Sequence, residues 1–176
     1  MALALPRRPA PHARLAVVVL GALAAALVIG NRFYRTAEMV LASGILRLVS
    51  GDGVHLAAHR QTIYFGLGSD TAFGLRMSPE CTSAFLVLPL LVVGAVMIAL
   101  RPAITRRVVV ALAVAAAAVI AVNQLRVLTL VGLIDWLGTD RGYHWGHTLL
   151  GSMVSVIGGA AALVLFVWLS TRRARS

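Results

Sequence analysis

The sequence predicts an all-α membrane protein, a bundle of about four transmembrane helices with an interfacial amphipathic helix and a short extracytoplasmic segment. Of the 176 residues, 60% are hydrophobic and only 12% are charged, whereas soluble domains carry about 25% charged residues. Mean hydropathy is +0.90. The apolar residues gather in four runs, and each run approaches the ~20 residues with which a helix crosses a bilayer.

The four runs form a single membrane domain, 1–176, with spans expected at about residues 15–34, 82–100, 108–134 and 148–170. Backbone polar groups have no water to bond in lipid, so helices are the structure expected for such runs. Arginines precede the first run as they precede a signal peptide. No small-x-small cleavage motif follows it at residues 28–31, so we expect a permanent span.

Charge predicts the orientation of the bundle. Nine arginines and no acid lie in the N-terminal segment, between the second and third runs, and at the C-terminus. All six acids lie in the two remaining segments. Because positive charge is retained in the cytoplasm, we expect both termini inside and residues of about 31–80 and 135–147 outside. Orientation thus accounts for the basic charge, and no nucleic-acid partner is expected.

The long outer segment contains two predicted elements. Residues 37–49 are expected to form the amphipathic helix along the membrane interface. Its apolar positions at helical spacing are Ala37, Val40, Leu41, Gly44, Ile45 and Leu48. Residues 61–68 contain Thr-Ile-Tyr-Phe, which favours a short extended piece.

Arg126 is a guanidinium inside the third apolar run, with Asn123 three residues earlier on the same helix face. Eighteen residues from Val108 correspond to ~27 Å of helix, which places Arg126 near the outer face. In one interpretation, the Arg126 side chain reaches the outer headgroups. In the other, it lines a polar cavity within the bundle, and the presence of Asn123 and Arg126 on one stripe favours this second interpretation.

Cys81 is the one cysteine of the chain, and it lies just before the second span. Ser78 is a good helix N-cap and Pro79 a good first helical residue, so Cys81 is expected in the first helical turn. There the positive helix end favours a thiolate, and the free amides around Thr82 and Ser83 would bind an oxyanion. The alternative is a buried cysteine without a role.

Two histidines, His144 and His147, stand at the outer mouth of the fourth span. Histidine transfers protons near neutral pH. It is equally common as an interfacial belt residue, here beside Tyr143 and Trp145.

With this topology, Cys81, Arg126 and His147 belong to three different helices yet share one depth at the outer edge of the membrane. A thiol, an imidazole and a guanidinium supply a nucleophile, a proton carrier and an anion stabiliser.

These residues, in this order, resemble the exosortase/archaeosortase family of membrane transpeptidases. The resemblance rests on three short motifs within about residues 78–159. They are Cys81-Thr82-Ser83, Asn123-Gln124-Leu125-Arg126 and His147-Thr148-Leu149-Leu150-Gly151.

The resemblance implies a cysteine peptidase or transpeptidase of the cell membrane, with its site on the extracytoplasmic side and with no cofactor or metal. It implies Cys81 as nucleophile, His147 as general acid and base, and Arg126 as oxyanion or thiolate stabiliser. Asn123, Thr82 and Ser83 would support them, and His144 is an alternative to His147. The implied substrate is a membrane-anchored protein with a C-terminal sorting signal, and the acceptor an amine, a lipid or water.

Two other functions compete with this one. One is a zinc site: His55 and His59 stand four residues apart, close to Asp52, and His144 and His147 stand three apart. Cys81 would complete the set of ligands. No His-Glu-x-x-His motif is present. The second alternative is a small assembly or transport subunit without enzymatic activity.

Overall fold

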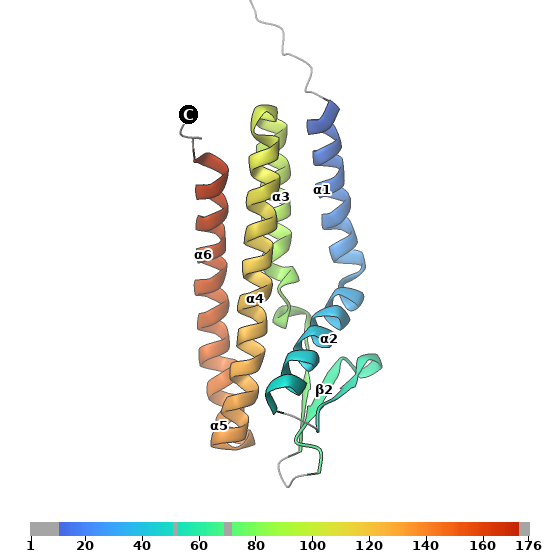
Figure 1. The fold of residues 1–176 in the computed structure, drawn as a ribbon, viewed down its shortest axis with the longest axis vertical. Coiled ribbons are helices and arrows are strands. Elements are labelled where there is room, and N and C mark those ends of the chain that lie inside the picture. The colour runs from blue at the N-terminus through green and yellow to red at the C-terminus, as the bar shows by residue number, and fades with distance from the viewer. Residues whose placement is uncertain (1–10, 51–52, 69–71, 173–176) are drawn as a thin grey trace, which may run out of the picture.

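The computed structural model describes residues 11–50, 53–68 and 72–172, which are mostly helical (Figure 1). The helices are α1 (Pro11–Ile29), α2 (Asn31–Ser50), α3 (Ala84–Leu100), α4 (Thr105–Leu137), α5 (Thr139–Tyr143) and α6 (Gly151–Thr171). A π-helical segment, His144–Leu150, joins α5 to α6. The strands are β1 (His55–Ala57), β2 (Thr62–Phe65) and β3 (Phe73–Arg76).

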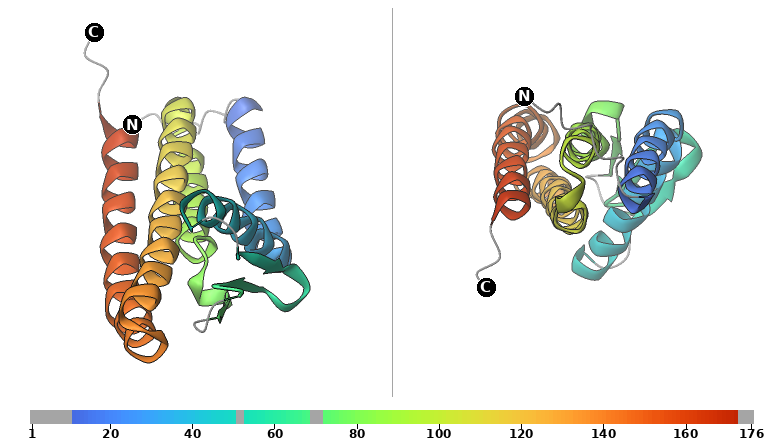
Figure 2. Two further views of the ribbon diagram at one scale, coloured as in Figure 1. Left: turned by 60° about the horizontal axis from the view of Figure 1, so that its bottom comes forward. Right: turned by 90° about the horizontal axis from the view of Figure 1, so that it is seen from above.

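Helix α4 lies in the middle of the bundle and packs against α6 and α3, while α1 packs against α3 (Figure 2). The inward stripe of α4 follows helical spacing, because Val108, Ala111, Ala115 and Val119 are all at most 1% exposed. Alanine on this stripe lets the neighbouring helices approach closely, as is usual in membrane bundles.

Within the part of the chain that the structure describes, three helical segments are long and apolar enough to cross a membrane: Pro11–Ile29, Pro102–Leu137 and Thr139–Thr171. Helix α3 is apolar but has only 17 residues. The apolar helices fit a multi-pass membrane protein, and the prediction of four spans is met for three of them.

The helix lengths are unequal. The C-terminus of α3, at Leu100, and the N-terminus of α4, at Thr105, lie at the same end of the bundle. At 1.5 Å per residue, the 17 residues of α3 cover about 25 Å and the 33 residues of α4 about 50 Å. Helix α4 therefore projects well beyond the other end of α3, and the three strands and α2 lie beside the projecting part (Figure 1).

The first predicted span, 15–34, is wrong at its C-terminal end. Helix α1 stops at Ile29, and Asn31 begins α2, which bends off the axis of α1 and crosses toward α4 (Figure 1). The turn requires Gly30, because a Cβ atom there would lie 2.7 Å from the carbonyl oxygen of Ala26. The third span is also longer than the expected 108–134.

Helix α2 covers the segment predicted to be an amphipathic helix, and its two faces differ in an unexpected way. The predicted apolar face points away from the protein, with Val40 54% and Leu48 88% exposed. The face that packs on the protein carries Glu38, Met39 and Leu46, which are at most 4% exposed.

The expectation of an all-α fold is wrong for residues 55–57, 62–65 and 73–76, which form a three-stranded antiparallel sheet in the order β1-β2-β3. Strand β2 lies within the predicted extended piece, and Ile63 pairs with Leu56 on one side and Leu75 on the other. Ile63, Met77, Val127 and Leu130 join one buried cluster between the sheet and the projecting part of α4.

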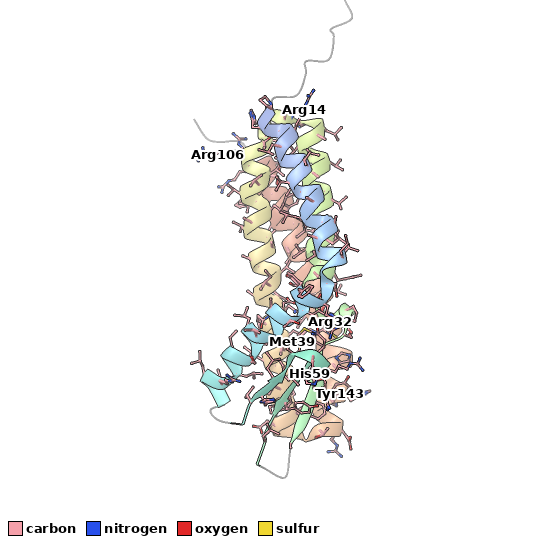
Figure 3. The ribbon with its side chains drawn as sticks, turned by 90° about the vertical axis from the view of Figure 1, so that its right-hand side faces the viewer. Arg14, Arg32, Met39, His59, Arg106 and Tyr143 are labelled. Atoms are coloured by element: carbon pink, nitrogen blue, oxygen red, sulfur yellow. The ribbon has the colours of Figure 1, made fainter. Side chains whose placement is uncertain are left out.

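The two segments predicted to share one side of the membrane do lie at one end of the bundle. Arg14 and Arg106 mark one end, and Arg32, His59 and Tyr143 lie toward the other (Figure 3). Residues 139–147 are helical rather than a loop. This helical return requires Gly142, where a Cβ atom would lie 2.4 Å from the carbonyl oxygen of Leu133.

Candidate active site

Cys81 lies on a short connection between the sheet and α3. The Met77 N–H donates to the Gln61 carbonyl oxygen at 2.9 Å and so continues the pairing of β2 with β3. Residues Pro79–Cys81 then form a single 3₁₀ turn, closed by a hydrogen bond from the Cys81 N–H to the Ser78 carbonyl at 3.1 Å. The Ser78 hydroxyl donates to the Cys81 Sγ atom at 3.3 Å. The thiol, half-buried, is thus held by its own turn.

The prediction that Cys81 occupies the first turn of the following helix is wrong. Thr82 is extended, with φ −100° and ψ 154°, and α3 starts only at Ala84. An extended residue interrupts the helical hydrogen bonds, so the thiol does not lie within α3. The Cys81 thiol is surrounded by polar side chains such as Ser78 and Arg126, and not by the N-terminus of α3.

The Ser83 amide is not free for an oxyanion, contrary to expectation. Its N–H donates to both carboxylate oxygens of Glu38 at 3.2 Å. The neighbouring Thr82 hydroxyl donates to the Pro79 carbonyl at 3.3 Å. Thr82 and Ser83 are 3% and 1% exposed, and their hydrogen bonds hold the backbone around Cys81.

Arg126 points into the bundle and connects α4 to two other parts of the chain. Its Nη1 donates to the Ser155 hydroxyl of α6 at 3.0 Å, and its Nη2 lies 4.0 Å from the Cys81 Sγ atom. The arrangement favours the polar-cavity interpretation over a side chain reaching for headgroups. A cation at this distance stabilises a thiolate.

Gly151 makes room for the Arg126 guanidinium. A Cβ atom at this position would lie 2.9 Å from Nε and 3.1 Å from Nη2 of Arg126. The Gly151 carbonyl also accepts a hydrogen bond from the Ser155 hydroxyl at 2.9 Å, which fixes the hydroxyl oxygen that receives Arg126. Gly151, predicted only as part of a motif, is therefore a positioning residue.

His147 is half-buried and lies in the π-helical segment, not at a helix start as expected. Its ring stacks on Tyr143, with ring centroids 5.0 Å apart and planes 9° from parallel. Tyr143 in turn packs on Phe73 of β3 at 6.1 Å. The alternative, His144, is exposed. Breaks of this π type in helices are common at functional sites.

Cys81, Arg126 and His147 together line two cavities. One is a small apolar cavity of about 30 Å³ between the sheet and α4. The other is a groove of about 680 Å³ along α3 and α6. The groove is lined in part by Ser78, Thr82, Phe85, Asn123, Ser152 and Ser155. The three predicted residues are thus brought together, and molecules in either cavity reach the thiol.

Glu38 is a member of the site that the sequence did not single out. The carboxylate is 4% exposed and accepts a hydrogen bond from Asn123 Nδ2 at 3.2 Å in addition to the Ser83 amide. Tyr34, one turn earlier, bonds the Ser83 hydroxyl. Burial raises the pKa of the Glu38 carboxyl, and the hydrogen bonds from Ser83 and Asn123 oppose that rise.

Asn123 donates its hydrogen bond to Glu38 and not to the Cys81 thiol. Asn123 lies on the groove, but its amide group binds Glu38. Glu38 therefore joins α2 both to the backbone beside Cys81 and to the helical turn that precedes Arg126. One sequence feature points to Glu38: it lies next to Met39, on the face of α2 opposite the predicted apolar face.

The residues of the zinc alternative do not gather as their spacing suggested. His55 lies on β1 and His59 in a 3₁₀ turn, so their separation of four residues does not place them on one helix face. Asp52 lies outside the described residues. Within the described ranges, no three side chains of the His, Cys, Asp and Glu types form a group that would hold a metal ion.

Comparison with known proteins adds no assignment to this geometry. The chain matches no family model, no curated protein and no solved structure.

Proposed function

We propose that this chain is a membrane cysteine peptidase or transpeptidase, similar to the exosortases and archaeosortases, that cleaves a C-terminal sorting signal of exported proteins. One observation carries the proposal. The Cys81 Sγ atom lies 4.0 Å from the Arg126 guanidinium, and both border the same two cavities as the His147 imidazole. This set supplies a nucleophile, a cation and a proton carrier.

The first half of the reaction forms a thioester. The His147 imidazole takes the Cys81 proton, and the thiolate attacks the carbonyl carbon of the substrate peptide bond. Arg126 stabilises the negative charge on the carbonyl oxygen. The carbon–nitrogen bond then breaks, and His147 returns its proton to the departing amine.

The second half releases the product. An amine acceptor or water gives a proton to His147 and attacks the thioester carbon, and the Cys81 thiolate leaves. An amine acceptor yields a transferred chain, whereas water yields a free carboxylate. Both outcomes balance without a cofactor or metal.

The membrane defines the substrate in this proposal. The substrate's own apolar helix anchors it, and its cleavage site reaches the groove beside α3 and α6. We infer that the site is extracytoplasmic, because Arg14 and Arg106, which belong to the acid-free arginine segments, lie at the opposite end of the bundle.

The test compares exported proteins in the native cells. The chromosomal gene is replaced by the wild-type sequence or by Cys81→Ala, and membrane expression of both is verified by immunoblot. We expect precursors that keep a C-terminal motif, an apolar helix and a basic tail to accumulate only with Cys81→Ala, as measured by mass spectrometry of C-terminal peptides. Identical processing in the two strains would overturn the proposal and favour a non-enzymatic subunit.

A further inference from the structure

The small cavity beside Cys81, named here the thiol pocket, has walls of a different character from the groove. Ile63 and Leu75 form one wall as a cross-strand pair of β2 and β3. Val127 and Leu130 of α4 form the opposite wall, and Met77 lies next to them. Apart from Arg76, Cys81, Arg126 and His147, all lining residues are aliphatic.

We propose that the thiol pocket binds the side chain of the substrate residue that supplies the acyl group, and that it selects a small aliphatic side chain. This inference rests on the function proposed above. In a thiolate attack, the new bond joins Sγ to the carbonyl carbon, and the Cα atom of the acyl residue is bonded directly to that carbon. Its side chain therefore starts closer to Sγ than any other side chain of the substrate.

The size of the thiol pocket sets the class of side chain. Its volume is about 30 Å³, and a cavity that holds one water needs at least ~10–15 Å³. Two or three carbon atoms fill such a volume, which corresponds to alanine, valine or proline. A phenyl ring does not fit unless Ile63 or Leu75 moves.

Most of the walls resist such movement. Ile63 is 1% exposed and is paired on both sides within the sheet. Val127 and Leu130 are 6% and 5% exposed on a continuous helix. Met77 is the adaptable wall, because methionine is unbranched and fills irregular gaps. Discrimination by size thus follows from packing that is fixed on two sides.

The chain offers a direct measurement, because it has one cysteine. The purified full-length protein in liposomes is treated with N-acetyl-aminoacyl chloromethyl ketones whose side chain is that of Ala, Val, Leu or Phe. The Cys81 thiolate displaces chloride and forms a carbon–sulfur bond. Peptide mass spectrometry gives the rate of alkylation at Cys81, and Cys81→Ala corrects for reaction elsewhere. Chloroacetamide, which has no side chain, reports the intrinsic reactivity of the thiol.

We expect the Ala and Val reagents to alkylate Cys81 at least 10-fold faster than the Phe reagent, since a hydrophobic pocket discriminates by about 10- to 200-fold per methylene. Leu75→Ala and Met77→Ala enlarge the pocket and should raise the Leu and Phe rates relative to Ala by at least 10-fold. Leu56→Ala is the matched control. Leu56 packs on the same cluster but does not line the pocket, so the preference should not change.

The outcomes separate the two proposals. Equal rates for all four reagents, with normal chloroacetamide labelling, would overturn the thiol pocket and leave the proposed function intact. A Cys81 no more reactive toward chloroacetamide at neutral pH than glutathione would count against the proposed function itself. A variant that fails to fold is recognised by an altered rate of chloroacetamide labelling. In that case the other of the two variants, Leu75→Ala or Met77→Ala, shows whether the thiol pocket selects by size.

Discussion

At the scale of single residues, the proposed function depends on the Arg126 guanidinium, which connects Cys81 to Ser155 of α6. We expect Arg126→Ala to lower the rate of processing by about 100- to 1,000-fold, the loss seen when one oxyanion donor is removed. Arg126→Lys keeps the charge but loses the planar fork, so it should recover only part of the rate. The measurement is single-turnover cleavage of an identified precursor. Arg141→Ala, at an exposed position of α5, is the matched control and should process normally.

Gly151 permits a second test at this scale. Gly151→Ala places a methyl group within 2.9 Å of Arg126 Nε, so the guanidinium must move away from Cys81. We expect slower processing and slower alkylation of Cys81 at neutral pH. Gly132→Ala is the matched control on α4, where a Cβ atom meets nothing within 4 Å. Equal alkylation rates in the two variants would show that Gly151 does not position Arg126.

The sequence predicted a great deal at the residue scale, for a physical reason. The alternation of arginine-rich and acidic segments places Cys81, Arg126 and His147 at one end of the bundle, and the structure brings them to the same two cavities. Glu38 escaped prediction because its role depends on which face of α2 packs inward. Met39 and Leu46 determine which face packs inward, because they are buried against α4 and the sheet. Both α4 and the sheet are distant from α2 in the sequence.

At the scale of elements, the packing of α2 on the bundle depends on the Glu38 side chain, which bonds the Ser83 amide and Asn123. Burial raises the pKa of this carboxyl above its ordinary value of 4.5, which means that folding favours the protonated form. The contribution of Glu38 to stability is therefore greatest below pH 4.5 and declines as the pH rises through the raised pKa.

Glu38→Gln removes this titration while keeping an oxygen that accepts from the Ser83 amide. We expect the melting temperature of the wild type relative to Glu38→Gln to fall as the pH rises from about 4 to 8. The measurement is thermal unfolding in detergent at each pH. Asp140→Asn, on exposed α5, is the control. A difference between wild type and Glu38→Gln that does not change with pH would contradict the assignment.

The sheet shows where prediction from sequence reached its limit among the elements. Strands β1, β2 and β3 have three, four and four residues, so none shows a long alternating pattern. Only β2, with Thr-Ile-Tyr-Phe, carries the β-branched and aromatic residues typical of strands. The other two strands are specified by pairing with β2 and by burial against α4, which a local pattern does not reveal.

At the scale of the whole molecule, the proposed orientation predicts accessibility from one side only. A membrane-impermeant maleimide added to intact cells should label Cys81, and tags at both termini should be reached by proteases only after the cells are opened. Cys81→Ser controls for labelling of other groups. Labelling of Cys81 from the cytoplasmic side alone would contradict the orientation that the arginines predict.

In the proposed function, the unequal lengths of α3 and α4 fix the distance between the membrane anchor of a substrate and the bond that is cleaved. Cys81 lies three residues before the short helix begins, whereas the long helix, α2 and the sheet rise around it. If the proposed function holds, a precursor anchored in the membrane by its own helix reaches the Cys81 sulfur only when its cleavage site lies at one distance from that anchor. Lengthening the spacer between a precursor's cleavage motif and its anchor by five extended residues, ~17 Å, should carry the scissile bond past the thiol.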